Sequence, residues 1–239
     1  MAKATREPLI GVVVPVNNGE LYLEDALRSV FSQTYRQFEV IVVDDGSRDR
    51  SSQIARSFEE ARLIRQTNQG VAAARNTGIS AAQADLLTFL DSDDTWPPDR
   101  LRIQVDFLLE HPDVGFTIGR YRNFLEPGTP RPQWLDEAAL KEEQTGYFPG
   151  TLIVRRATLE TVGLFNPDYR VGEGAEWFVR AKETNVPMAI LDDVLLHRRI
   201  HGSNLTRQAR LVNSSILQAL KESLDRKRKG PRTGRQNDE

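Results

Sequence analysis

Residues 38–47 read Phe-Glu-Val-Ile-Val-Val-Asp-Asp-Gly-Ser, and residues 86–94 read Leu-Leu-Thr-Phe-Leu-Asp-Ser-Asp-Asp. Each stretch is a short apolar run that ends directly in carboxylates. Short, nearly continuous apolar runs are typical of strands that are buried on both faces of a parallel sheet. In open sheets of this kind, ligands bind outside the carboxyl ends of the strands. The two stretches therefore predict a buried sheet with a carboxylate-rich site along one edge.

The rest of the first half alternates apolar runs with amphipathic segments, which predicts an α/β fold with helices packed on a mostly parallel sheet. Residues 120–150 contain four prolines and read as a loop-rich insertion. Besides the two strands above, the predicted elements are a strand at 9–16, a helix at 23–31, a helix from 51, a strand at 62–65, helices at 72–82 and 97–110, strands at 114–118 and 151–154, helices at 157–162 and 176–183, a strand at 188–191 and a last amphipathic helix that ends near 225.

The net charge of −2, from 32 Lys and Arg against 34 Asp and Glu, divides unevenly along the chain. Residues 226–239 hold six basic and two acidic side chains, or +4, so residues 1–225 carry −6. A mildly acidic body argues against a domain that holds nucleic acid phosphates. No run approaches the ~18 apolar residues of a membrane helix, and the start has no signal-peptide core. Without Cys there are no disulfides or thiolate metal sites. The cytoplasm is the expected location.

Two common phosphate-binding motifs are absent from the sequence. No Gly-x-Gly-x-x-Gly follows the first strand, and no Gly-Lys-Ser/Thr loop occurs, so neither a dinucleotide fingerprint nor a P-loop is present. A site rich in carboxylates and poor in such glycines favours a hard divalent cation that bridges to a diphosphate. Mg²⁺ and Mn²⁺ prefer oxygen ligands and usually take one or two protein carboxylates beside phosphate and water.

Five segments together resemble family 2 glycosyltransferases of the GT-A fold, in the family's order and spacing. They are Val13-Val14-Pro15-Val16-Asn17-Asn18, Gln33-Thr34-Tyr35, Val42-Val43-Asp44-Asp45-Gly46-Ser47, Ala74-Arg75-Asn76-Thr77-Gly78 and Phe89-Leu90-Asp91-Ser92-Asp93-Asp94. The resemblance implies a nucleotide-sugar donor, UDP-linked or similar, a metal held by an Asp-x-Asp motif, and inverting transfer to a hydroxyl acceptor. It also implies a place in the biosynthesis of cell-surface polysaccharides.

The resemblance assigns roles residue by residue. It implies that Asp45 contacts a uracil-like base, that Asp93 binds the metal directly, and that His201 is a metal-side or phosphate contact. The complete implied nucleotide site is Pro15, Asn17, Asp44, Asp45, Arg75, Asp91 and Ser92, and the implied metal site is Asp93, Asp91 and His201. The expected divisions are a tail at 1–8, a nucleotide-sugar half at 9–118 and an acceptor-side half at 119–205. Periodicity adds a C-terminal helix at 206–225, and composition adds a disordered basic tail at 226–239.

Inverting transfer also needs a base that takes the proton of the acceptor hydroxyl. The family supplies it from a Glu-Asp pair that opens a late helix. Here Glu173 matches the Glu, but Gly174 stands in the Asp position. Glu173 and Glu176 share one face of the predicted helix opening, and both stay open as the base.

Two alternatives follow from the same residues. Asp91-x-Asp93-x-Thr95 after an apolar strand also fits the nucleophile strand of haloacid-dehalogenase-like phosphatases, although that family places this strand first. With Gly174 in the base position, the chain could also bind a sugar nucleotide or glycan and transfer nothing. The expected partners are a nucleotide-sugar donor and a glycan or lipid-linked acceptor, without nucleic acid. Contact of the basic tail with an anionic membrane, at its inner face, is a minority expectation.

Overall fold

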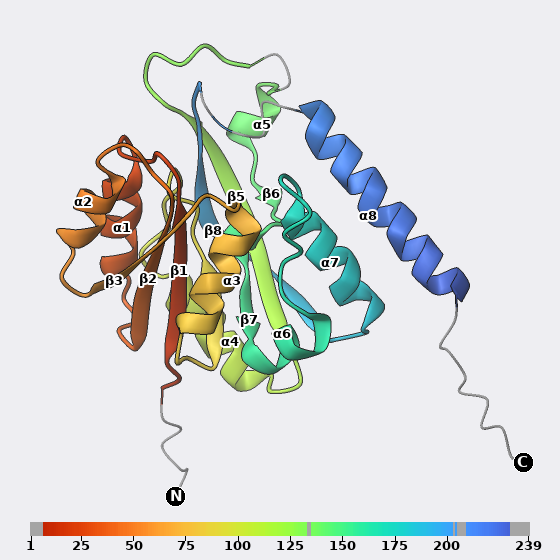
Figure 1. The fold of residues 1–239 in the computed structure, drawn as a ribbon. Helices are drawn as coiled ribbons and strands as arrows, with labels where there is room; N and C mark the ends of the chain where they lie inside the picture. The colour runs from red at the N-terminus through yellow and green to blue at the C-terminus, as the bar shows by residue number, and fades with distance from the viewer. Residues whose placement is uncertain (1–6, 133–134, 203, 205–208, 230–239) are drawn as a thin grey trace, which may run out of the picture.

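The computed structural model describes residues 7–132, 135–202, 204 and 209–229. Figure 1 shows one sheet with helices on both faces and a long helix on the outside. The strands are β1 Ile10–Val16, β2 Phe38–Asp45, β3 Ala61–Gln66, β4 Leu86–Phe89, β5 Phe116–Leu125, β6 Gln144–Thr145, β7 Ile153–Arg155 and β8 Met188–Ile200. The helices are α1 Leu23–Phe31, α2 Ser51–Arg56, α3 Val71–Ala81, α4 Arg100–Glu110, α5 Ala138–Lys141, α6 Arg156–Val162, α7 Glu173–Glu183 and α8 Ala209–Lys229, with a short 3₁₀ helix η1 at Pro149–Thr151.

The strand order β3-β2-β1-β4-β7-β5-β6 confirms the predicted α/β fold. The first four strands are parallel, and β1 lies between β2 and β4. The second half is mixed, because β7 runs antiparallel to both β4 and β5, while β8 pairs with β5 in parallel. β5 crosses the predicted boundary at 118/119, so the two predicted halves share one continuous sheet.

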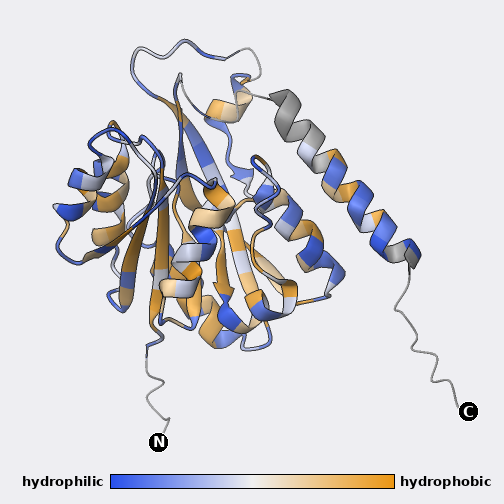
Figure 2. Cartoon of the chain, in the orientation of Figure 1, coloured by the Kyte–Doolittle hydropathy of each residue, from blue (hydrophilic) through white to orange (hydrophobic). Residues whose placement is uncertain are grey.

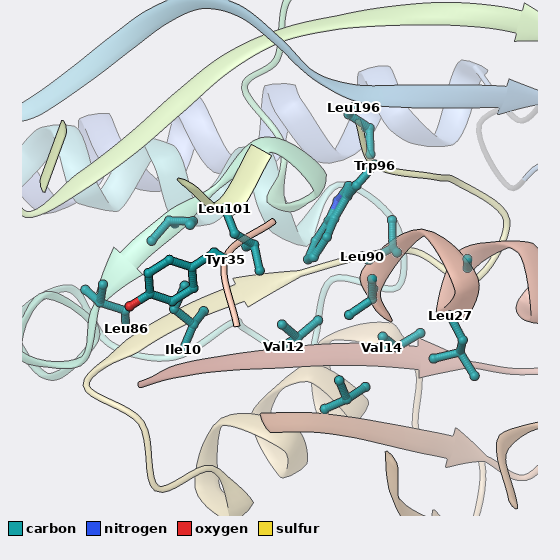
Figure 3. Close-up of a cluster of buried hydrophobic side chains, with 14 of the residues drawn as sticks. Ile10, Val12, Val14, Leu27, Tyr35, Leu86, Leu90, Trp96, Leu101 and Leu196 are labelled. Carbon is teal, nitrogen blue, oxygen red and sulfur yellow. The ribbon is translucent and has the colours of Figure 1, made fainter. Parts of the chain in front are cut away.

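Alternate residues of β1 face opposite sides of the sheet, as the strand period of two requires. Val12 and Val14 pack into one apolar cluster with α1 and α4, as Figure 3 shows around Leu27 and Leu101. Val13 packs into a second cluster with α3, α6 and α7. Burial on both faces explains why β1 is apolar throughout. Packing on both faces also holds the parallel strands in place, so that their carboxyl ends lie along one edge of the sheet.

The last helix differs from its predicted boundary. α8 runs to Lys229, whereas the sequence predicted that the helix ends at 225 and that a disordered tail begins at 226. Arg226 continues the helix and forms an ion pair with Glu183 of α7 at 2.9 Å. Lys and Arg are good helix formers, so their charge alone does not end a helix. The rest of the predicted tail, residues 230–239, lies outside the described residues.

In the part of the chain that the structure describes, no helix has the length and apolarity needed to cross a bilayer.

Candidate active site

Hydrogen bonds join the loops that follow β1 and β2. The Asn17 side chain donates to the backbone oxygen of Asp45 at 2.6 Å, and the Asn18 backbone N–H donates to Ser47 Oγ at 2.9 Å. Asn18 adopts a positive φ of 54°, a conformation that Asn tolerates better than most residues. Pro15 lies one step before this loop, buried at the end of β1. The two loops therefore form one rigid edge at the carboxyl ends of the strands.

Asp44 and Asp45 are adjacent in sequence but have different environments. The Asp44 carboxylate accepts hydrogen bonds from the Ser47 N–H at 2.7 Å and from the Ser52 hydroxyl. Burial raises the pKa of Asp44, but these hydrogen bonds and the nearby Arg65 outweigh burial and hold that pKa below its ordinary value. The Asp44 carboxylate thus organises its own loop.

The Asp45 carboxylate points toward the segment that opens α3. It accepts hydrogen bonds from the Gln66 side chain and from the backbone N–H groups of Gln69 and Gly70, each at 2.8 Å. Gly70 has a φ of +94°, which allows this turn before the helix. A carboxylate has about four acceptor positions, so Asp45 keeps capacity for a further donor.

Arg75 of α3 connects the end of β4 to the start of α7. Its guanidinium is 2% exposed and forms ion pairs with Asp91 and with Glu173, which lies 98 residues later in the chain. Burial lowers the pKa of Arg75, but the two carboxylates outweigh burial and raise it. The structure therefore brings three of the sequence-predicted residues together in one ion-pair cluster around a buried guanidinium.

Asp93 lies beside His201, as the predicted metal site requires. Asp93 Oδ2 is 2.9 Å from His201 Nε2 and accepts a hydrogen bond from the Asn204 side chain at 3.0 Å. The ring of Tyr22 packs against His201, with 4.5 Å between ring centroids. Ser92 is close to the loop after β1, because a Cβ on Gly19 would lie 3.0 Å from Ser92 Oγ. The loops after β1 and β4 therefore border the same site.

Arg199 supports the Asp91–Asp94 loop from the end of β8. Its backbone N–H donates to Asp94 Oδ1 at 2.8 Å, and its Nε donates to the Asp93 backbone oxygen at 3.0 Å. The same guanidinium pairs with Asp25 and Glu126. Burial, together with the charges of Asp93 and Asp91, raises the pKa of Asp94 well above its ordinary value. The sequence analysis had not singled out Arg199 as a loop support.

The two candidate bases occupy different positions. Glu176 is 2% exposed, and both of its oxygens are held by Arg180, four residues later on α7. Arg180 also donates to the backbone oxygens of Val162 and Leu164, so this pair fastens α7 to the preceding turn. Glu173 faces the Arg75 and Asp91 cluster instead. Of the two, only Glu173 is in contact with the other predicted site residues.

Pro149 fills the space beside Gly174, which stands in the family's Asp position. A Cβ on Gly174 would lie 2.4 Å from Pro149 Cδ, closer than real side chains approach. A proline ring cannot swing aside as a long flexible side chain can. Pro149 therefore leaves no room for an Asp side chain at position 174.

The donor set at Asp93 fits a small divalent cation. It offers a carboxylate and an imidazole, with a second carboxylate, that of Asp91, on the same loop and 37% exposed. Among the described residues, no three His, Asp or Glu side chains form a closed metal cluster. Ions such as Mg²⁺ and Mn²⁺ take few protein ligands when phosphate and water complete the shell, so an open site of this kind suits them.

Residues 11–165 match the family model described as glycosyl transferase family 2, and the chain belongs to that family. An uncharacterized glycosyltransferase of Haemophilus influenzae is 43% identical over 119 residues, which cover 48% of this chain and 47% of that protein. The putative teichuronic acid biosynthesis glycosyltransferase TuaG of Bacillus subtilis is 35% identical over 129 residues, covering 52% and 51%. The chain thus spans about half the length of these relatives.

Two solved structures share the fold. S. aureus TarS in complex with UDP-GlcNAc aligns with a TM-score of 0.74 and 21% identity, covering 90% of this chain and 65% of that one. The mannosyltransferase PcManGT from Pyrobaculum calidifontis, in complex with GDP-Man and Mn²⁺, gives 0.73 and 21%, covering 93% and 66%. The family match favours the glycosyltransferase interpretation over the phosphatase alternative.

Proposed function

We propose that this chain transfers a sugar from a nucleotide-diphosphate sugar, UDP-linked, to a hydroxyl acceptor, with inversion and with the help of Mn²⁺ or Mg²⁺. The observation that carries the proposal is that Asp45 ends β2 while Asp91 and Asp93 follow β4, the two strands that flank β1. Arg75 of α3 joins Asp91 to Glu173 at the same edge of the sheet. The nucleotide-sugar complexes of the two structural neighbours support a donor of this class.

In this proposal the base and ribose of the donor lie along the loops that follow β1 and β2. Asp45 accepts the imide N–H of the base, Asp44 keeps the loop in shape, and Pro15 and Asn17 line the same edge. Arg75, Asp91 and Ser92 lie toward the ribose and diphosphate. Asp93, Asp91 and His201 would hold the cation, which neutralises the negative charge that develops on the departing nucleoside diphosphate.

Glu173 is the proposed base. In the transfer step the acceptor oxygen forms a bond to the anomeric carbon, the bond from that carbon to the diphosphate breaks, and Glu173 takes the acceptor proton. Pairing with buried Arg75 orients this carboxylate. Glu176 is assigned a structural part, because Arg180 occupies both of its oxygens.

The acceptor is proposed to be a glycan or lipid-linked sugar of a cell-surface polysaccharide. The similarity to TuaG, a putative teichuronic acid biosynthesis glycosyltransferase, supports this class of acceptor. The location proposed for the chain is the cytoplasm, where nucleotide sugars are made.

The test is release of nucleoside diphosphate from a panel of nucleotide sugars, with and without Mn²⁺. Asp93→Asn and Glu173→Gln are each expected to lower kcat by about a hundredfold or more, the usual effect of losing a charge-stabilising or proton-accepting group. Glu176→Gln is expected to lower the melting temperature and to leave kcat of the folded protein nearly unchanged. Asp192→Asn, on the exposed part of β8, is the matched control. Full activity of Glu173→Gln would refute the assignment of the base.

A second function, binding of sugar nucleotides without transfer, is favoured by the contact of Gly174 with Pro149. It predicts that UDP with Mn²⁺ raises the melting temperature while no donor of the panel is turned over. Asp93→Asn would then abolish the thermal shift, whereas Glu173→Gln would leave it in place.

A further inference from the structure

α8 packs on α7 through one of its faces. Ala219 and Ser223 of α8 are buried against the body of the protein. Glu222 accepts a hydrogen bond from the Tyr169 hydroxyl at 3.0 Å, and Arg226 pairs with Glu183. Figure 1 shows α8 on the outside of the molecule, beside α7. One side of the helix is thus fixed to the protein, and the other side is directed outward.

The outward side carries a stripe of leucines, which we call the leucine stripe: Leu217, Leu220 and Leu224, with 68%, 47% and 56% of their surface exposed. At 100° per residue, these positions lie within a sector of about 60°. In Figure 2 apolar and hydrophilic bands alternate along α8. Isolated exposed leucines are ordinary, but three on one helical face form a contiguous apolar surface.

Exposed basic side chains border the leucine stripe. Lys221 and Arg228 each follow a stripe leucine by four residues, so they lie on the same side of the helix. The acidic residues of α8 are Glu222 and Asp225, and neither falls within the stripe. Glu222 faces the body of the protein, where it contacts Tyr169. Asp225 follows Lys221 by four residues and lies on the same edge. The outward side of α8 is therefore apolar along its centre, with two basic side chains and one acidic side chain along its edge.

We propose that α8 lies flat on an anionic bilayer surface, with the leucine stripe in the boundary between headgroups and acyl chains. An interfacial helix of this kind combines a narrow apolar face with Lys and Arg beside it. The basic side chains would lie against lipid phosphates, and each positive charge near such a surface adds to the attraction. The 21-residue length of α8 is compatible with an interfacial position, because a helix of this length with a largely polar surface lies along a membrane rather than across it.

Charge complementarity favours a lipid surface over a second copy of the chain. A twofold contact through the leucine stripe would place the same surface of both copies together. Lys221 and Arg228 of one copy would then approach the same residues of the other. Anionic headgroups instead present opposite charge to both side chains.

The experiment is flotation of the full chain with vesicles of phosphatidylcholine alone and of phosphatidylcholine mixed with an equal part of phosphatidylglycerol. The chain is expected to float with the mixed vesicles only, and less at high salt. The triple variant Leu217→Ser, Leu220→Ser and Leu224→Ser is expected to bind the mixed vesicles at least about tenfold more weakly, because three leucines are lost from the apolar contact. Lys221→Glu with Arg228→Glu is expected to weaken binding as well.

Matched controls separate this proposal from a general loss of surface properties. Leu109→Ser, Leu164→Ser and Ile190→Ser change three aliphatic side chains of 42–47% exposure elsewhere on the molecule and should leave flotation unchanged. Arg36→Glu with Arg56→Glu plays the same part for charge. Absence of flotation with the mixed vesicles would overturn the proposal, and so would binding that survives loss of the leucine stripe. If the original chain did not bind vesicles but eluted as a dimer in size-exclusion chromatography, and the triple variant eluted as a monomer, the leucine stripe would be assigned to contact with a second copy.

Discussion

At the residue scale, Pro149 restricts which side chains can occupy position 174. Substituting Asp for Gly174 restores the carboxylate of the family pattern, but its Cβ would collide with Pro149 Cδ. We expect Gly174→Asp to lower the free energy of unfolding by about 1–3 kcal/mol, the usual cost of overpacking, and not to raise kcat. Adding Pro149→Ala should recover part of that loss. Urea unfolding and donor turnover measure both effects.

Ala175→Asp is the control for that substitution, because Ala175 is partly exposed in the same helical turn. An acid in the first turn of a helix is favourable, so this variant should be as stable as the original chain. If Gly174→Asp were equally stable, the contact with Pro149 would not limit the position.

His197 of β8 gives a stability term that depends on pH. Burial, and to a lesser extent the charge of Arg122, lowers the pKa of His197 below its ordinary value of 6.5. The unfolded chain then binds more protons than the folded one between the two pKa values. The contribution is complete above pH 6.5 and is lost as the pH falls through the folded pKa. Chemical unfolding across this range should show a steeper loss of stability for the original chain than for His197→Gln. Parallel curves would contradict this origin.

At the scale of elements, the end of β8 acts as a support for the Asp91–Asp94 loop. Arg199 contacts this loop through both its backbone and its guanidinium, and it also pairs with α1 through Asp25. Lys cannot reproduce the fork of donors of Arg. Arg199→Lys is therefore expected to raise the Mn²⁺ concentration for half-maximal thermal stabilisation by UDP about tenfold, which corresponds to loss of roughly one hydrogen bond. Arg120→Lys, which changes an exposed ion pair with Asp192, should leave that concentration unchanged.

The elements of the first half agree with the sequence prediction to within a few residues, because β1, β2 and β4 are buried along most of their length and are therefore nearly continuous apolar runs. β5 and β8 were predicted much too short, at 114–118 and 188–191. Their later residues alternate or cluster charges, and Arg120 and Arg122 pair with Asp192 and Glu143 on the exposed side of the sheet. A half-exposed strand of this composition resembles a loop in sequence, and only its pairing with another strand identifies it.

The candidate site was predictable where a motif follows a buried strand, as for Asp45, Asp91 and Asp93. The approach of His201 to Asp93 came only from the family resemblance and has no local signal. The choice between Glu173 and Glu176 needed the structure, because both lie in the first turn of α7 and only their partners, Arg75 and Arg180, distinguish them.

At the scale of the whole molecule, the site joins parts of the chain that are far apart in sequence. Arg75 and Glu173 are 98 residues apart, Arg199 and Asp94 are 105 apart, and His201 and Asp93 are 108 apart. All three links attach the second half of the chain to the first: one to α3, and two to the loop that follows β4. The segment that matches the family model, residues 11–165, contains only the partner of each link that comes earlier in the chain, namely Arg75, Asp94 and Asp93.

These long separations have a consequence for the order of folding. Contacts between distant residues form late, since the intervening chain must first lose its freedom. During synthesis, the strands β1 to β4 can pair while Asp91 and Asp93 still lack Glu173, Arg199 and His201 as neighbours. The proposed binding of metal and donor should therefore appear only after β8 has joined the sheet. Ligand binding would then measure how much of the chain has reached that stage of folding.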